Sequence, residues 1–310
     1  MPDRRQHTRD ELQSYFRDRR NWGRWGDKGA AGAMNMIDAE KRVAAAALVK
    51  SGRTVSLSRP WPAQPSLDNP RPAQQHLSKA DLGGGAGWAF DYIGVSFHGA
   101  ATTHIDALCH VWDEDGMWDG RDHTAAVTFG GANYGTVDEW SDGIVTRGVL
   151  LDVPKHRGKP YVTNEEPVHG WELEDIVREQ GLAIQPGDAI MVYSGREAYA
   201  EEHDGAWWGG ARGTVQTQPG LHASCLPFVR DNDISVLGWD MMDALPQDSG
   251  VPWNMHAVIF TYGVALLDNS LLQPLAEACA EEDRYEFMLC ISPLKIVGGT
   301  GSPVNPIAVF

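Results

Sequence analysis

Three histidines and an aspartate fall within a thirteen-residue stretch, from His98 to His110, that reads HGAATTHIDALCH. The spacing of these residues predicts how their side chains point, because side chains alternate between the two faces of an extended strand. We therefore expect His104 and Asp106, two residues apart, to point the same way. If the chain turns helical after Asp106, His110 returns to a neighbouring position four residues later. The pattern predicts a short strand followed by a turn, with imidazoles and a carboxylate gathered together.

The chemistry of the gathered side chains is that of metal ligands. Imidazole and carboxylate groups bind divalent cations such as Zn²⁺ or Mn²⁺. The alternative is a polar turn whose histidines are hydrogen-bonded within the core. A lone histidine would favour that alternative. The pattern H-x-D-x-x-x-H favours a metal site instead. Cys109 lies inside the same stretch. We expect it to be a small packing residue rather than a nucleophile or a soft ligand.

Charge and composition exclude several classes of protein. The net charge of −16 and the pI near 5.0 argue against binding to a phosphate backbone, which needs a basic surface. No apolar stretch reaches the length of a membrane span, and residues 1–7 lack the apolar core of a signal peptide. The four cysteines are scattered without a C-x-x-C pair, as in reduced proteins. We expect a cytoplasmic protein that binds neither nucleic acid nor membranes.

Segments with the pattern of strands alternate with segments that have the pattern of helices, which predicts an α/β fold. We expect one domain over residues 1–310. Residues 60–87 are rich in Pro and Gly and low in periodicity, which predicts a long loop of the kind that often acts as a lid. Strands are expected at 143–153, 189–193 and 234–239, and helices at 8–20, 38–50, 171–180, from 221 up to Pro227, and at 271–282.

Many of the twelve tryptophans sit in Gly- or Pro-rich surroundings. Aromatic side chains on irregular loops commonly line a pocket for a flat, largely apolar ligand, which makes Trp22, Trp25 and Trp88 candidates for substrate binding. The alternatives are that such loops pack against the body or form a subunit interface. We expect a homo-oligomer, either a dimer or a tetramer.

Residues 100–110, AATTHIDALCH, resemble the motif H-x-G-T-H-x-D-x-P-x-H of the metal-dependent cyclase superfamily. That superfamily includes bacterial arylformamidases, isatin hydrolase and a trans-dienelactone hydrolase. Ala100 stands where the motif has its first histidine, and Thr102 where it has glycine. Further segments resemble the family in the same order: 190–195 with its Ser-Gly turn, 219–221 (PGL), and His256 with the later Asp268-Asn269.

The resemblance implies a fold and a site. The fold would be a single cyclase-like domain of the swivelling β/β/α type, with a mixed sheet or barrel-like core flanked by helices. The N-terminal helices and aromatic loops of residues 1–90 would form a loop-rich cover, in which Trp22 and Trp25 lie where the family tends to place a substrate-contacting aromatic side chain.

The metal ligands implied by the resemblance are His104 and Asp106, joined by His256 and Asp268. The first histidine of the motif is a ligand in the family's formamidases, so its replacement by Ala100 favours one cation over two. His98 lies two positions earlier and in the same register if the chain stays extended, so it is a further candidate ligand; about three protein ligands suffice for a catalytic site.

His110 resembles the family's proton donor and acceptor. An imidazole suits that role because its unperturbed pKa lies near 6.5. The expected cofactor is one divalent metal ion, Zn or Mn.

The expected activity is metal-dependent hydrolysis of the amidase or lactonase type. A bound cation polarises a carbonyl and activates water, which would cleave a C–N or C–O bond of a small cyclic amide, lactone or N-acyl arylamine. Two alternatives stay open. The departure at Ala100 is compatible with a catalytically inactive member that binds a small molecule, and a polarised carbonyl serves a lyase or cyclase as well.

Overall fold

The computed structural model describes residues 7–203, 217–246 and 249–310. Its centre is four parallel strands that lie side by side: β7 (Ile144–Asp152), β8 (Ala189–Tyr193), β9 (Val236–Trp239) and β10 (Ala265–Asp268). Every residue of β8, β9 and β10 is buried. Parallel strands are normally covered on both faces. These short strands are accordingly rich in apolar residues and lack an alternation of polar ones.

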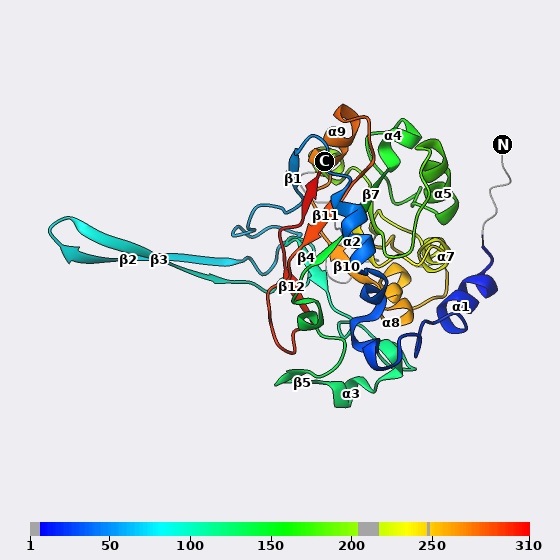
Figure 1. Ribbon diagram of the computed structural model, residues 1–310, viewed down its shortest axis with the longest axis horizontal. Helices are drawn as coiled ribbons and strands as arrows, with labels where there is room; N and C mark the ends of the chain where they lie inside the picture. Colours follow the sequence, from blue (N-terminus) through cyan, green and yellow to red (C-terminus); the bar gives the residue numbers. More distant parts are fainter. Residues whose placement is uncertain (1–6, 204–216, 247–248) are drawn as a thin grey trace.

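Antiparallel strands extend this centre on both sides into a nine-stranded sheet of order β1-β13-β11-β7-β8-β9-β10-β4-β12. The sheet curls into a half-barrel flanked by helices (Figure 1). The expectation of a mixed sheet or barrel-like core flanked by helices is therefore confirmed. The added strands are β1 (Thr54–Ser56), β13 (Ile307–Val309), β11 (Glu286–Ile291), β4 (His104–Asp106) and β12 (Gly301–Pro303).

The N-terminal helix α1 (Arg9–Arg17) shows how local sequence and packing agree. Thr8 accepts a hydrogen bond from the Glu11 backbone, and the Glu11 side chain accepts one from the Thr8 backbone, so that both ends of a capping box are present. The helix buries Leu12 and Phe16, and the Phe16 ring packs edge-on against Phe260.

The other α-helices lie around the sheet. None of the helices in the described ranges is long and apolar enough to cross a bilayer. They are α2 (Ala39–Ala46), α3 (His123–Ala126), α4 (Val153–Arg157), α5 (Gly170–Glu179), α6 (Arg196–Glu202), α7 (Leu226–Asp231), α8 (Ala257–Tyr262) and α9 (Gln273–Glu281). Short 3₁₀ helices and a small ribbon complete the body: η1 (Gly26–Met36), η2 (Trp118–Gly120), η3 (Val137–Trp140), η4 (Ala223–Cys225), η5 (Asn254–His256), β5 (Val127–Thr128) and β6 (Gly131–Ala132).

Several helix boundaries differ from the sequence expectation, since the helices expected at 8–20 and 38–50 span only Arg9–Arg17 and Ala39–Ala46. The segment from residue 221 was expected to be helical up to Pro227, but Pro227 lies in the first turn of α7. Proline is tolerated there because the amide groups of the first turn have no partner within the helix. The strand expected at 189–193 coincides with β8.

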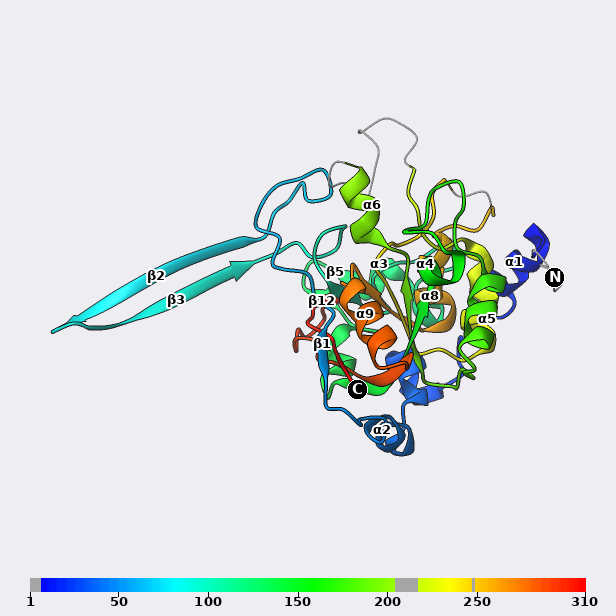
Figure 2. The same ribbon diagram turned by 90° about the horizontal axis from the view of Figure 1, so that it is seen from above.

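The expectation of a long loop over residues 60–87 is wrong in its second half. β2 (Gln74–Gly83) pairs with β3 (Ala86–Gly94) as an antiparallel ribbon, which projects far from the body (Figures 1 and 2). The chain reverses at Gly83, Gly84 and Gly85, whose φ angles of 81°, 65° and 83° favour glycine. The glycine run is therefore a hairpin turn. We call residues 74–94 the arm.

Candidate metal centre

The ladder between β4 and β10 brings the first two carboxylates of the site together. His104 lies opposite Asp268, and Asp106 lies opposite Leu266. Directly opposed residues share a face, as do residues two apart along one strand, so His104, Asp106 and Asp268 all project from the same side. The residue between the two β4 ligand candidates, Ile105, is fully buried in the core.

His98 and His110 approach this face from the two ends of the motif. After β4 the backbone turns, with the His110 N–H donating to the Ala107 carbonyl at 3.0 Å, so a turn rather than a helix returns the imidazole. Nε2 of His110 lies 3.8 Å from Asp106 Oδ2, and Nδ1 of His98 lies 2.8 Å from Asp106 Oδ1. The rings of His98 and His110 stack with centroids 3.8 Å apart.

His256 enters from the start of α8, far along the chain. Its Nε2 lies 3.5 Å from Asp268 Oδ2, and its Nδ1 donates to Asp243. The other oxygen of Asp268 accepts a hydrogen bond of 2.5 Å from the indole N–H of Trp239. The structure thus brings together every metal-ligand candidate named from the sequence, together with His110.

Three imidazoles are each anchored through one nitrogen. Nδ1 of His104 donates to the Thr102 carbonyl at 2.8 Å, and Nε2 of His98 lies 3.0 Å from the Thr300 hydroxyl. With His256 held by Asp243, each ring turns its second nitrogen toward a carboxylate of Asp106 or Asp268. Metal-ligating histidines are held in this way, because the outer partner fixes both the tautomer and the ring orientation.

The carboxylate of Asp106 fits a cation better than it fits its protein neighbours. Both oxygens are buried, and neither accepts a hydrogen bond within the described residues. The imidazole nitrogens around them lie 2.8 to 3.8 Å away without the alignment of a hydrogen bond. Buried carboxylates are normally paired or coordinate a metal. Two sets of three groups, each with ligand atoms within 4.8 Å of one another, share this carboxylate: His98, His104, Asp106 and Asp106, His256, Asp268.

The potential at these groups is negative. Burial alone would lower the pKa of His104, but Asp106 and Asp268 outweigh it and raise that pKa to about 8. Burial likewise opposes the upward shift at His256, whose pKa Asp243 and Asp268 hold well above its ordinary value. His110 is different, because burial, helped by the neighbouring histidines, lowers its pKa to about 4 although Asp106 opposes the shift. His110 is thus held as a neutral base, while His104 and His256 favour the positively charged form.

These residues face a cavity of about 380 Å³. One side of it is apolar, formed by Met242, Leu245 and Trp253. Trp253 is 46% exposed, has a left-handed φ of 65°, and donates its indole N–H to the Trp112 carbonyl at 2.7 Å. Such a backbone conformation in a bulky residue is strained and often marks a functional position. The remaining lining residues are His98, Gly99, His104, Asp106, His110, Gln218, Asp243, His256 and Asp268.

The three tryptophans named from the sequence lie elsewhere. Trp22 donates to the Phe260 carbonyl at 2.6 Å, and Trp25 packs against Trp118 with ring centroids 5.9 Å apart. Trp88 is on the arm. None of the three lines the cavity beside the histidines.

Sequence reasoning missed Asp243, which carries no motif signal. Trp253 belongs to the tryptophans in Gly- or Pro-rich surroundings that the sequence marks as pocket candidates, and it does line the cavity. Its position three residues before His256 could have singled it out from the others.

Ala100, the residue that departs from the motif, is buried, and its carbonyl accepts a hydrogen bond of 2.8 Å from the buried guanidinium of Arg196. Arg196 also donates to the side chain of Asn269 at 2.9 Å, next to Asp268. These contacts tie the segment that carries His98 to the end of β10.

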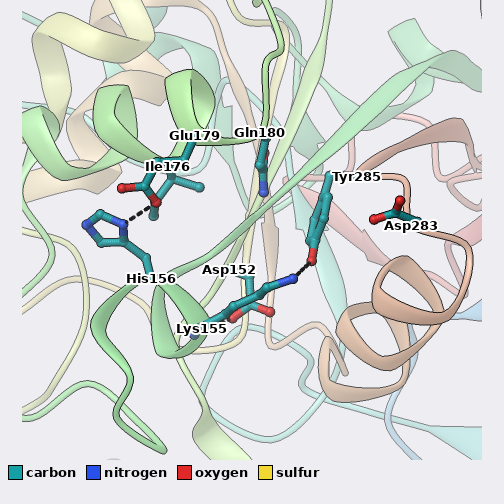
Figure 3. Close-up of a pocket in the computed structure, with 8 residues that line it drawn as sticks. All are labelled: Asp152, Lys155, His156, Ile176, Glu179, Gln180, Asp283 and Tyr285. Carbon is teal, nitrogen blue, oxygen red and sulfur yellow. Dashed lines mark hydrogen bonds and ion pairs between the residues drawn. The ribbon is translucent and has the colours of Figure 1, made fainter.

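A larger cavity of about 530 Å³ lies between α4, α5 and the loop before β11 (Figure 3). Lys155 points to the Tyr285 hydroxyl, and His156 Nδ1 lies 2.8 Å from Glu179. None of the residues that line this cavity belongs to either metal-ligand set. The candidate metal ligands line the smaller cavity.

Comparison with known proteins agrees with this geometry. The family model for Cyclase matches residues 53–244. A solved structure described as a novel cyclase is 27% identical with a TM-score of 0.78, covering 94% of this chain and 99% of that one. Isatin hydrolase A from Labrenzia aggregata, bound to benzyl benzoate, is 20% identical with a TM-score of 0.56, covering 83% and 93% of the two chains.

A third structure, described as a potential metal-dependent hydrolase with cyclase activity, is 16% identical with a TM-score of 0.50 and covers 83% of this chain and 98% of that one. The search of curated protein sequences found no match. At identities this low the last two structures speak for the fold alone. The family model spans well over half of the sequence, including β4 and the motif of His104, Asp106 and His110, and the chain accordingly belongs to the Cyclase family.

Proposed function

We propose that the protein is a divalent-metal-dependent hydrolase of the amidase or lactonase type. The observation that carries the proposal is the buried carboxylate of Asp106, which accepts no hydrogen bond within the described residues and is surrounded by imidazole nitrogens. His98, His104 and Asp106 form one ligand set, and His256 and Asp268 complete the second through Asp106. We expect one bound ion, Zn²⁺ or Mn²⁺, since both accept such ligands.

When bound, the cation supplies Lewis acidity, which polarises a carbonyl and activates water. The residues of the chain do the rest. His110 lines the cavity as a neutral imidazole beside Asp106, where it accepts a proton from the attacking water and returns it to the leaving group. The stacked ring of His98 restricts the orientation of His110.

The apolar side of the cavity selects the substrate. Trp253, Met242 and Leu245 offer a surface to which a flat ring can bind. A small cyclic amide, lactone or N-acyl arylamine has such a ring next to a carbonyl. The net charge of −16 disfavours polyanionic substrates. Trp22 and Trp25 stay candidates for substrate contact only if the loops that carry them rearrange.

A substrate panel with metal removal tests this function. Purified protein is stripped with a chelator, reloaded with Zn²⁺ or Mn²⁺, and incubated with lactones, cyclic imides, isatin and N-formyl arylamines while product masses are recorded. We expect a product heavier than a cyclic substrate by one water, or two fragments from an N-acyl arylamine, only after reloading. Full activity of the stripped protein would contradict the proposal.

The same panel separates the two alternatives. A lyase or cyclase gives products that have lost water or another small group. A non-catalytic member of the family binds a panel compound without turnover, and the replacement at Ala100 is the feature that favours it. We further propose that the protein acts in the cytoplasm as a homo-oligomer, a dimer or tetramer.

A further inference from the structure

The cavity beside the candidate metal ligands contains a buried, uncharged amide side chain. Gln218 lines this cavity and is 2% exposed. Its backbone is hydrogen-bonded to that of Leu245 in both directions, at 3.1 and 2.9 Å. Its side-chain nitrogen Nε2 donates to the Asp243 carbonyl at 2.8 Å. The backbone and the side chain of Gln218 are therefore both held in place.

The oxygen of this amide has no partner in the protein. Oε1 of Gln218 is buried and accepts no hydrogen bond within the ranges that the structure describes. The Asp243 carbonyl can only accept, so it must face the nitrogen of the amide, and this fixes which end is the oxygen. A buried acceptor without a partner costs free energy. An N–H or O–H group of a ligand in the cavity would supply that partner.

The amide lies beside the candidate metal ligands. Gln218 and His256 are both attached to Asp243, Gln218 through the main-chain carbonyl and His256 through the carboxylate. The backbone partner of Gln218 is Leu245, which belongs to the apolar side of the cavity. A flat ligand that lies against the apolar side therefore has the candidate metal ligands and the Gln218 amide along its edge.

We propose that Gln218 is a specificity-determining residue, whose Oε1 accepts a hydrogen bond from an N–H group next to the scissile carbonyl of the substrate. This inference rests on the proposed function and narrows it. A lactone has an oxygen in place of that N–H group. The lactone oxygen carries lone pairs and no hydrogen, so it repels the Gln218 oxygen and leaves it unpaired. The substrate is then a cyclic amide or imide rather than a lactone.

The geometry of a cyclic amide suits these two neighbouring partners. In a small ring the amide bond is cis, which places the N–H and C=O groups on the same edge of the molecule. An open-chain secondary amide prefers the trans form, in which the two groups point in opposite directions. A ring that turns its carbonyl toward His256 and the other candidate ligands thus turns its N–H group toward the same wall, where Asp243 holds Gln218. Open-chain N-acyl arylamines fit this arrangement less well.

Calorimetry with the chelator-stripped, full-length protein tests the inference without turnover. The probes are isoindolinone, N-methylisoindolinone and phthalide, which share one ring system and carry N–H, N–CH₃ or O next to the carbonyl. Wild type should bind isoindolinone about 5- to 150-fold more tightly than the other two, the effect of leaving a buried acceptor unpaired. Gln218→Met, which keeps the length of the side chain but lacks the acceptor, should bind all three within about threefold of one another.

Gln180→Met is the matched control. Nε2 of Gln180 donates to the Leu150 carbonyl at 3.0 Å, and its Oε1 is likewise buried without a hydrogen-bond partner. Gln180 lines the larger cavity of about 530 Å³ instead, so its replacement should leave the preference for isoindolinone unchanged. Circular dichroism of both variants checks the fold. If Gln218→Met does not fold, the comparison of the three probes in wild type still decides.

Turnover is measured separately, on protein reloaded with Zn²⁺ or Mn²⁺. Gln218→Met should lower kcat/KM for cyclic imides more than for lactones, mainly through a higher KM. A binding preference without any turnover would contradict the proposed hydrolase and leave the role of Gln218 standing. Turnover without a binding preference would do the reverse.

Three results would overturn the inference. The first is wild-type protein that binds phthalide as tightly as isoindolinone. The second is a Gln218→Met variant that folds and keeps the wild-type preference. The third is the absence of isoindolinone binding at millimolar concentration.

Discussion

Asp243 holds His256 at three points. One carboxylate oxygen accepts hydrogen bonds from the backbone N–H groups of Met255 and His256, at 2.6 and 3.0 Å. The other oxygen accepts a hydrogen bond from Nδ1 of the imidazole. The same group thus fixes the first turn before α8 and the orientation of the ring. The Nε2 atom of His256 is left to face Asp268.

The first prediction follows from this contact. Asp243→Asn should weaken metal binding by about 10- to 100-fold, the usual effect of removing an outer partner of a ligating histidine. The amide nitrogen of asparagine cannot accept from an N–H group, so His256 loses its fixed tautomer. Competition with a fluorescent chelator measures the affinity. Asp231→Asn, on the surface, serves as control, and equal affinity in both variants would show that His256 is not a ligand.

The second prediction separates metal binding from proton transfer. His104→Ala or Asp106→Ala should remove metal and activity together, because a site of three or four ligands tolerates little loss. His110→Ala should keep most of the metal and lower kcat by about 10²- to 10⁴-fold, as expected for a general acid–base residue. Metal analysis of each folded variant is the measurement. An empty site in His110→Ala would make His110 a ligand.

The third prediction concerns a buried ion-pair cluster away from the site. Asp188 is fully buried and pairs with Arg147 at 2.6 Å and Lys41 at 2.5 Å. Asp188→Ala takes the buried carboxylate away from both cations, leaves Arg147 with only the more exposed Glu286, and should lower the free energy of unfolding by about 3–5 kcal/mol. Glu286→Ala removes the more exposed partner of Arg147 and should cost about 1 kcal/mol or less. Urea denaturation distinguishes the two, and equal losses would contradict the assignment.

The fourth prediction is a loss of stability at alkaline pH. Burial raises the pKa of the Cys109 and Cys279 thiols from about 9 to about 12. Since the folded state binds these protons more tightly than the unfolded chain, their contribution is complete below pH 9 and is lost as the pH rises toward 12. Cys109→Ala/Cys279→Ala should therefore show a shallower fall of unfolding free energy above pH 9 than wild type. Parallel curves would show that the thiols titrate normally in the fold.

The sequence alone predicts those parts of the site that depend on residues close together in the chain. Strand alternation alone places His104 and Asp106 on one face, and the structure has them so. Asp268 and His256 came only from the family resemblance, because the pairing of β4 with β10 joins residues far apart in the chain. Asp243 is a single acidic residue whose role depends on the position of another segment, so no pattern marks it.

The arm was missed for a different reason. Trp88, Phe90 and Tyr92 alternate as a strand requires, but the partner strand holds Ser, Lys and Ala, and the glycine run between them resembles an unstructured loop. Pairing across a hairpin depends on both strands at once, and only one of them carries a clear signal.

The connection between the arm and the metal centre is short. β3 ends at Gly94, and only Val95, Ser96 and Phe97 separate it from His98. The base of the arm therefore lies close, along the chain, to one imidazole of the ligand set. A change in the angle at which the arm leaves the body would also move that ring. A contact that restrains the tip of the arm would therefore also restrain His98, four residues beyond the end of β3.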